Sequence, residues 1–287
     1  MYGGFWQMQS IESINEMQSL AINLRSEKKL IGFVPTLGGL HEGHLSLVDY
    51  AKKKADVVVA SIYLNPEQFG PNEDFDRYPR TLENDLRQLE ERKVDFVFIP
   101  DTKSIYPDDY STYLVEDKLS ARLCGISRPV YFRGVATVVA ILLNIVRPDF
   151  AVFGQKDAQQ CAVIKKFVRD LRFPIEIDVC PTVREKDGLA MSSRNAYMDD
   201  VQRKEACALY QSLQKAEKMI RGGEKSVNRI IEEITNYLSA FSHLRLIYAS
   251  VVHRDSLELL GEIAPGQSLV AISAWCDDIR LIDNIVI

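Results

Sequence analysis

Short apolar runs that recur along the first two thirds of the chain constrain its fold most. The runs are rich in Val, Ile and Phe, and helix-like segments separate them. Strands covered on both faces have this composition, because neither face of such a strand meets water. Alternation with helices favours a parallel sheet that has helices on both sides. We predict strands at Leu30–Val34, Val57–Leu64, Phe96–Pro100, Phe150–Gly154 and Ile175–Cys180.

After about Asn195 the pattern changes from alternation to helices followed by strands. Two helix-like stretches precede three strand-like runs there, as in a smaller α+β domain. We therefore predict an α/β fold in which residues 1–182 form a Rossmann-like doubly wound parallel sheet and residues 183–287 a C-terminal α+β domain. The elements expected in the second domain are helices near Val201–Arg221 and Ser226–Phe241 and strands at Leu244–Val252, Leu269–Ala274 and Arg280–Ile287.

Composition excludes several classes of protein. No run approaches the roughly 18 apolar residues of a membrane span, and Met1–Ser10 lacks a basic region followed by an apolar run. The five cysteines are scattered, which favours reduced thiols in the cytoplasm. A net charge of −5 is unsuited to non-specific nucleic-acid binding. We expect no membrane and no nucleic acid as partners.

The strongest chemical signal is a pair of histidines in the segment Pro35–His44. The chain has only four histidines, and His41 and His44 stand three residues apart after the first predicted strand and before an apolar-periodic stretch. A turn from strand to helix exposes backbone amides at the positive end of the helix dipole, which attracts phosphate. If residues 41–44 form one helical turn, both imidazoles lie on one face and can donate to phosphate oxygens. A Gly-rich turn with a single histidine is more often an ordinary loop, and the paired histidines favour a site.

The segment Asn65–Gly70 places a neutral amide at the carboxyl end of the second predicted strand. Open α/β sheets bind ligands at that edge. The side chain of Gln68 can both donate to and accept from a hydroxy acid. The alternative is a polar residue in a turn.

The segment Phe153–Gln160 again ends a strand and begins a helix. Lys156 supplies a mobile cation for phosphate, Asp157 an acceptor for ribose hydroxyls, and Gln160 a second amide. An isolated Lys-Asp pair is usually a solvated surface contact. Its place at the end of a strand favours the site.

A fourth segment, Pro181–Asn195, joins the two predicted domains. The hydroxyls of Ser192 and Ser193 and the guanidinium of Arg194 can close over a triphosphate from a loop at a hinge. A Ser-Ser-Arg loop is common, so this segment indicates a site only in combination with the three segments described above.

Together these motifs resemble the pantothenate synthetase family within the His-x-Gly-His nucleotidyltransferases. The resemblance covers roughly residues 30–200, including Tyr78–Asp85 and Tyr131–Val135, and thereafter only the general layout. It implies ATP-dependent condensation of (R)-pantoate with β-alanine through a pantoyl adenylate, giving pantothenate, AMP and pyrophosphate for coenzyme A biosynthesis. It also implies Mg²⁺ held mainly by phosphate oxygens without a dedicated protein metal site, a homodimer, and a C-terminal domain that closes over ATP.

The same resemblance implies roles for individual residues. His44, His41 and Lys156 would be catalytic, Gln68 and Gln160 would bind pantoate, and Gln68 would also bind β-alanine. The residues implied to contact ATP are Leu37, Gly38, Gly39, Leu40, His41, Glu42, Gly43, His44, Gly154, Gln155, Lys156, Asp157, Val183, Met191, Ser192, Ser193 and Arg194.

Three positions depart from the family pattern: Leu37 replaces Met, Gln155 replaces Glu, and Tyr131 replaces His. Glu67 also adds a carboxylate beside the expected acid site. Two rival functions share the fold: a transferase that moves AMP or CMP onto a phosphate ester, and a regulatory nucleotide-binding protein without turnover. The first needs a basic pocket for a second phosphate, and paired glutamines suit a carboxylate with hydroxyls better. A transfer-RNA synthetase would need an anticodon module for which this chain has no room.

Overall fold

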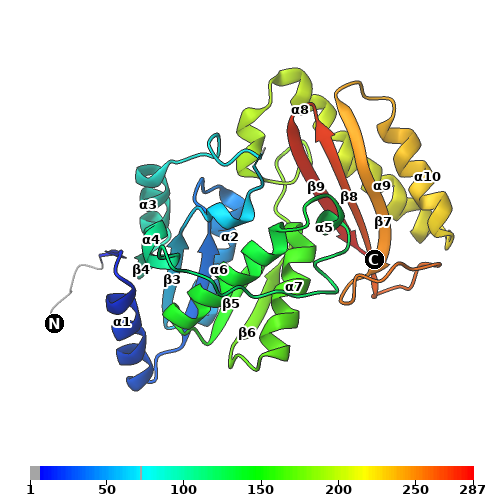
Figure 1. Ribbon diagram of the computed structural model, residues 1–287. Helices are drawn as coiled ribbons and strands as arrows, with labels where there is room; N and C mark the ends of the chain where they lie inside the picture. Colours follow the sequence, from blue (N-terminus) through cyan, green and yellow to red (C-terminus); the bar gives the residue numbers. More distant parts are fainter. Residues whose placement is uncertain (1–6, 72) are drawn as a thin grey trace. The chain divides into compact units, whose positions relative to one another are not determined.

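A computed structural model describes residues 7–71 and 73–287 of the chain (Figure 1). Residues 1–6 of the Met1–Ser10 segment, and with them part of the expectation about export, lie outside the described residues. The chain forms two compact units. One contains residues up to 117, 128–154 and 163–180, and the other contains 118–127, 155–162 and 181–287. We predicted a single domain boundary after residue 182. In the structure, residues 118–127 and 155–162 belong to the same unit as residues 181–287.

The first unit is built on a six-stranded sheet whose neighbouring strands are all parallel, in the order β1-β4-β3-β2-β5-β6. From β2 the chain adds β3 and β4 toward one edge of the sheet, and it then adds β5 and β6 on the other side of β2. The strand order therefore reverses between β2 and β5, which is the switch point of a doubly wound sheet. The predicted α/β fold is therefore confirmed. The strands are β1 (Gln9–Ile11), β2 (Ile31–Thr36), β3 (Val57–Ile62), β4 (Phe96–Phe98), β5 (Phe150–Gly154) and β6 (Glu176–Cys180).

Helices flank this sheet (Figure 1). One core cluster joins apolar residues of α2 and α3, among them Leu45, Val48 and Leu89, to alternate residues of the strands such as Val34 and Val58. This is the period-two pattern of a strand meeting the apolar face of a helix. The helices associated with the sheet are α1 (Ile14–Ser26), α2 (Glu42–Lys54), α3 (Leu82–Glu91), α4 (Thr102–Ile105), α6 (Tyr131–Val146) and α7 (Ala158–Asp170), with a 3₁₀ turn η1 (Pro66–Gln68).

The second unit is an antiparallel sheet in the order β7-β8-β9, against which α9 and α10 pack (Figure 1). The single helix predicted over Val201–Arg221 is two helices in the structure, α8 and α9, which meet at Cys207. The elements are α5 (Cys124–Ser127), η2 (Gln155–Asp157), η3 (Ser193–Tyr197), α8 (Asp200–Ala206), α9 (Ala208–Arg221), α10 (Val227–Leu238), β7 (Leu244–His253), β8 (Ser268–Cys276) and β9 (Ile279–Val286).

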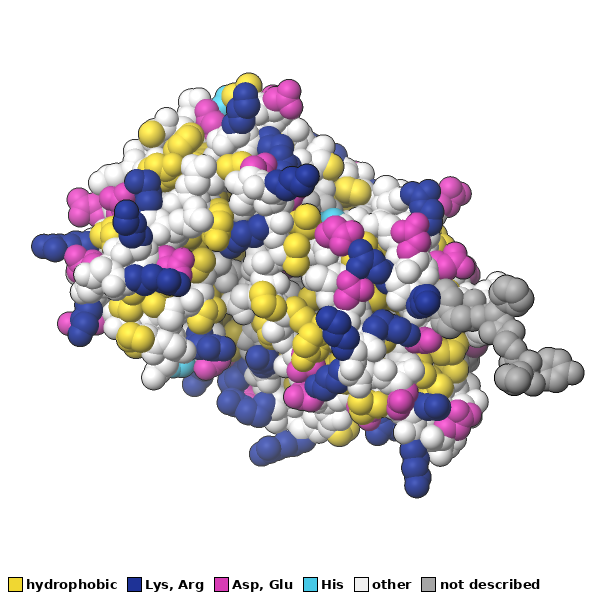
Figure 2. Space-filling view, turned by 180° about the vertical axis from the view of Figure 1, so that it is seen from behind, with side chains coloured by type: hydrophobic (Ala, Val, Ile, Leu, Met, Phe, Trp, Pro, Cys, Tyr) yellow, Lys and Arg dark blue, Asp and Glu magenta, His cyan; other side chains and the backbone are white. Residues whose placement is uncertain are grey.

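The described helices include none that is long and apolar enough to span a bilayer. On the face shown in Figure 2, basic and acidic side chains are interspersed. Such a mixed surface fits the small net charge of the chain.

Candidate active site

The histidine segment forms the predicted turn from strand to helix, between β2 and α2. His41 is the N-cap of α2: its backbone is extended, and its Nδ1 accepts a hydrogen bond of 3.1 Å from the amide of Gly43. His44 lies in the first turn, with its amide 2.8 Å from the carbonyl oxygen of His41. The two ring centroids are 4.0 Å apart. Both imidazoles therefore lie side by side at the positive end of the helix dipole.

The turn before these histidines is held by a buried carboxylate. Asp85 on α3 is 1% exposed, and its Oδ2 and Oδ1 accept hydrogen bonds from the amides of Gly39 (2.9 Å) and Leu40 (3.0 Å). The hydroxyl of Thr81 donates to the same carboxylate at 3.0 Å. Gly38 has φ +85°, and a Cβ there would lie 3.2 Å from the carboxylate, so glycine is needed on both conformational and steric grounds. α3 thereby fixes the backbone that leads to the histidines.

The turn that carries Gln68, η1, packs directly against α6. Asn65 is fully buried, and its Nδ2 donates to Gln68 Oε1 (3.0 Å) and to the carbonyl of Gly134 (3.2 Å). A Cβ on Gly134 would lie 2.1 Å from the carbonyl oxygen of Glu67. The backbone of η1 thus rests directly on the helix, and the amide of Gln68 is held in one orientation.

An ion pair braces the same turn on its other side. Arg128 forms two hydrogen bonds with the carboxylate of Glu73, donates to the carbonyl of Gln68 at 3.1 Å, and stacks 3.7 Å from the ring of Tyr131. The planar guanidinium suits both contacts at once. Tyr131, which departs from the family pattern, therefore has a packing role in this chain.

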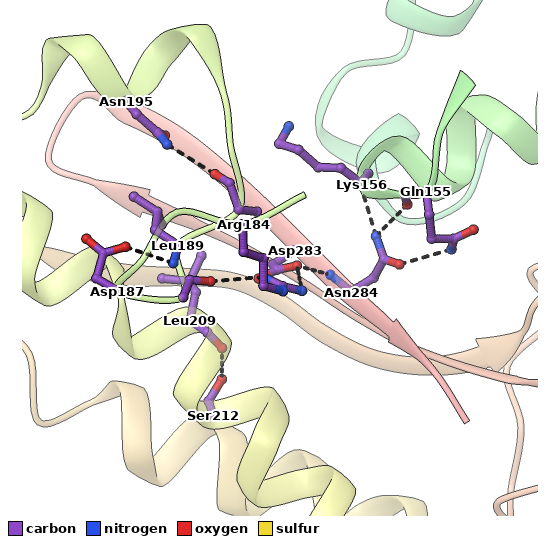
Figure 3. A network of polar contacts seen from close by, with 12 residues as sticks. Gln155, Lys156, Arg184, Asp187, Leu189, Asn195, Leu209, Ser212, Asp283 and Asn284 are labelled. Carbon is purple, nitrogen blue, oxygen red and sulfur yellow. Dashed lines mark hydrogen bonds and ion pairs between the residues drawn. The ribbon is translucent and has the colours of Figure 1, made fainter. Parts of the chain in front are cut away.

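In the second unit, Lys156 lies in η2 beside a residue from β9. Its amine is 3.8 Å from Asp157 Oδ1, and its side chain is 20% exposed. Asn284 donates through Nδ2 to the carbonyls of Gln155 and Lys156, and its Oδ1 accepts from Gln155 Nε2 (Figure 3). Gln160 is half-buried. The backbone around Lys156 is fixed by these contacts.

The segment between residues 183 and 191 folds back on itself as a hairpin ahead of the serines. Arg184 pairs with Ala190, and the guanidinium of Arg184 donates to Asp283 on β9 at 2.6 and 2.9 Å. Burial raises the pKa of Asp283, while the guanidinium of Arg184 opposes that shift. Ser192 caps η3 by accepting from the amide of Arg194 at 3.3 Å.

Comparison with known proteins decides the family. The model of the pantoate-beta-alanine ligase family matches residues 9–286. A pantothenate synthetase of Pseudothermotoga lettingae is 53% identical over 277 residues, which are 96% of this chain and 98% of that protein. The chain belongs to the pantoate–β-alanine ligase family. The resemblance read from the motifs is thus confirmed over the chain's length.

Solved structures of other ligases agree. A pantothenate synthetase of Thermus thermophilus superposes with a TM-score of 0.91 at 40% identity, covering 97% of this chain and 99% of that one. A pantoate-beta-alanine ligase of Francisella tularensis, complexed with beta-gamma ATP and beta-alanine, gives a TM-score of 0.79 at 32% identity, with 98% of each chain covered. Members of the ligase family join pantoate and β-alanine to make pantothenate, and this chain is such an enzyme.

The structure distributes the predicted site residues of the ligase over its two units. The first unit holds Leu37, Gly38, Gly39, Leu40, His41, Glu42, Gly43, His44, Gln68 and Gly154. The second holds Gln155, Lys156, Asp157, Gln160, Val183, Met191, Ser192, Ser193 and Arg194. Within each unit, the turns that carry these residues are held by buried polar contacts.

Several residues that hold the segments carrying the predicted site residues had no role assigned from the sequence. They are Asn65, Glu73, Asp85, Arg128, Arg184, Asp283 and Asn284. Most carry no motif of their own, and their partners are far away in sequence. Asp85 offered one signal, since it closes the family-like stretch from Tyr78. Asp85 is buried on α3 together with Leu89, and a buried carboxylate needs hydrogen-bond partners.

Proposed function

We propose that the ligase makes pantothenate in two steps from ATP, pantoate and β-alanine. The carboxylate of pantoate attacks the α-phosphorus of ATP, so that an acyl–phosphate bond forms and pyrophosphate leaves. The amine of β-alanine then attacks the acyl carbon, an amide forms, and AMP leaves. The observation that carries this proposal is the pair of adjacent imidazoles at the start of α2, 4.0 Å apart by ring centroid.

The nucleotide is bound by both units in this proposal. The amides and histidines from Leu37 to His44 meet the phosphates, because a helix N-terminus attracts anions. His41 and His44 stabilise the charge that develops at the α-phosphorus and on pyrophosphate. Gly154, Gln155, Asp157, Val183 and Met191 hold the remainder of ATP. Ser192, Ser193 and Arg194 bind its phosphates from the C-terminal domain, residues 183–287, as that domain closes, and Lys156 also binds them.

Gln68 holds pantoate in the first unit, and Gln160 contributes a second amide from α7. Gln68 also contacts β-alanine in the second step. The support is the pinned orientation of Gln68, whose Oε1 accepts from Asn65 at 3.0 Å, which directs its NH₂ group toward other acceptors. Fixing the acid beside the nucleotide removes the entropy of their encounter.

Magnesium enters with the nucleotide in this proposal, held by phosphate oxygens and water. Residues 7–71 and 73–287 contain no group of three or more His, Cys, Asp or Glu side chains suited to hold a metal ion. When bound, the ion offsets negative charge on the phosphates.

We also propose that the ligase is a homodimer that works in the cytoplasm. Family membership supports the first, and the five scattered, buried cysteines support a reducing compartment. Sedimentation equilibrium at micromolar concentration tests the dimer, which a single species of 32.6 kDa would contradict.

The decisive experiment measures AMP, pyrophosphate and pantothenate from ATP and Mg²⁺ with pantoate, with β-alanine, and with both. Turnover that needs both acids, and that falls at least about 100-fold in His44→Ala, is expected from the loss of one donor to the transition state.

The matched control is His253→Asn, a histidine of β7 whose Nδ1 accepts from the amides of Asp255 and Ser256. Asparagine keeps an acceptor there, so wild-type turnover is expected. Full activity of His44→Ala would remove the histidines from the mechanism. AMP transfer to a phosphate ester, without an amide product, would instead favour the rival transferase.

A further inference from the structure

A polar residue outside every motif holds the segment that carries Lys156. We propose that Asn284 on β9 is a positioning residue that fixes the backbone of Lys156 and so aims its amine at the nucleotide. The inference rests on the proposed role of Lys156 in binding ATP.

The amide group of the Asn284 side chain directs both of its N–H donors and its oxygen acceptor to the segment that carries Lys156. Both hydrogens of Nδ2 are donated, to the carbonyl oxygens of Gln155 and Lys156 at 3.0 Å each. Its Oδ1 accepts from Gln155 Nε2 at 3.1 Å. Asn284 is 5% exposed, so little water is present to replace these bonds. Aspartate would lack both donors, and an apolar residue would lack all three contacts.

The side chain of Gln155 is chemically matched to that of Asn284. An amide at position 155 can donate to Asn284 Oδ1, whereas the carboxylate of a glutamate would place two acceptors against each other. The pair Gln155–Asn284 is therefore complementary in this chain.

Asn284 is itself held by its neighbour. The amide of Asn284 donates to Asp283 Oδ1 at 2.7 Å, and Asp283 is locked by two hydrogen bonds from Arg184. Successive side chains of a strand point to opposite faces of the sheet. β9 therefore contacts the hairpin of residues 183–191 through Asp283 and the segment that carries Lys156 through Asn284 (Figure 3).

A fixed backbone matters for a lysine, because its long and flexible side chain does not by itself set the position of the amine. Figure 3 shows the amine of Lys156 extending away from Asn284, so the asparagine fixes the backbone from which the side chain starts and does not contact the amine. A site residue is aimed well only where its backbone is held, and a displacement of about 1 Å can lower a rate by roughly 100-fold.

The test is a double-mutant cycle with Asn284→Ala, Lys156→Ala and the double variant. The readouts are kcat, KM for ATP, KM for pantoate, and nucleotide Kd by calorimetry. We expect Asn284→Ala to lower kcat/KM for ATP by 10-fold or more and to change KM for pantoate less than about 2-fold. In the Lys156→Ala background the same change should cost less than about 2-fold, because its effect passes through the lysine.

Asn228→Ala is the matched control, an exposed asparagine on α10 of the same unit, and should behave as wild type. If Asn284→Ala does not fold, Asn284→Ser replaces it, because the short hydroxyl is polar and uncharged but cannot make all three contacts, and the cycle is repeated with it. Equal losses with and without Lys156, or wild-type kinetics, would overturn the inference. Wild-type kinetics of Lys156→Ala would instead show that the proposed site is wrong, which is a separate failure.

Discussion

His41 caps α2 and, in the proposed mechanism, also acts on the phosphates, and mutation can separate the two roles. Its Nδ1 caps α2 by accepting from Gly43, and the rest of the ring faces His44. Asparagine is among the best N-caps, but it cannot reach as far as an imidazole. We expect His41→Asn to keep its stability within about 0.5 kcal/mol and to lose at least about 10-fold in kcat, whereas His41→Ala loses about 1 kcal/mol as well.

Urea titration and steady-state kinetics on the two variants measure these effects. Equal unfolding free energies for the alanine and asparagine variants would show that the cap contributes nothing. Unchanged kcat in both would confine His41 to a structural role.

For single residues, the sequence could predict a role where residue type and local spacing together indicate a chemical function. His41, His44 and Lys156 stand in local motifs and could be proposed as site residues from the sequence. Asn284 could not be found, because an asparagine in a strand has no distinctive neighbours and its partners lie more than 120 residues earlier. Long-range side-chain contacts of this kind depend on how strands are ordered in space, which one sequence does not reveal.

At the scale of elements, α3 supports the histidine turn through one carboxylate. Asp85→Asn would replace one acceptor by an NH₂ group that faces an amide donor, either Gly39 or Leu40. A buried donor left without an acceptor costs about 1–3 kcal/mol. We expect a lower melting temperature and a raised KM for ATP. Glu83→Gln, an exposed change on the same helix, is the control, and equal behaviour of the two variants would contradict the role of Asp85.

The contact between α6 and η1 leaves no room for a methyl group. Because a Cβ at Gly134 would lie 2.1 Å from the carbonyl oxygen of Glu67, Gly134→Ala must separate the helix from the turn. We expect a loss of about 3 kcal/mol and a higher KM for pantoate, since Gln68 moves with the turn.

Gly261→Ala, where nothing lies within 4 Å of the new Cβ, is the control for the glycine change itself. Thermal unfolding and kinetics distinguish the two variants. A Gly134→Ala protein with wild-type stability would show that the helix and turn are not rigidly packed.

Elements were predicted well where the apolar pattern was long. The five predicted strands of the first sheet all form, with ends shifted by up to two residues. β1 was missed because three residues, of which only Ile11 is buried, carry no periodic signal. The break at Cys207 was missed because this residue has helical backbone angles, and neither glycine nor proline marks the break.

At the scale of the whole molecule, pH acts on stability through an exposed pair of the second unit. A hydrogen bond donated to Asp277 raises the pKa of His243, while hydrogen bonds accepted from Gln202 and then His243 lower the pKa of Asp277. The raised pKa of His243 stabilises the fold below its unfolded pKa, and this contribution is lost as pH rises through the folded pKa. The contribution of Asp277 is present above its unfolded pKa and is lost as pH falls.

Both groups are charged between these limits, from roughly pH 4 to somewhat above pH 6.5. The melting temperature of the wild type should therefore exceed that of His243→Gln by more at pH 5.5 than at pH 8.5. A difference that does not change with pH would mean that the imidazole acts without its charge.

The second unit is discontinuous in sequence, since residues 118–127 and 155–162 join residues 181–287. Recombination between two parent genes at a single crossover near residue 181 would therefore not exchange a whole unit. It would combine residue 155 of one parent with residue 284 of the other, and a parent with glutamate at 155 would bring an acceptor to Asn284. Functional chimeras should be those that inherit both positions from the same parent.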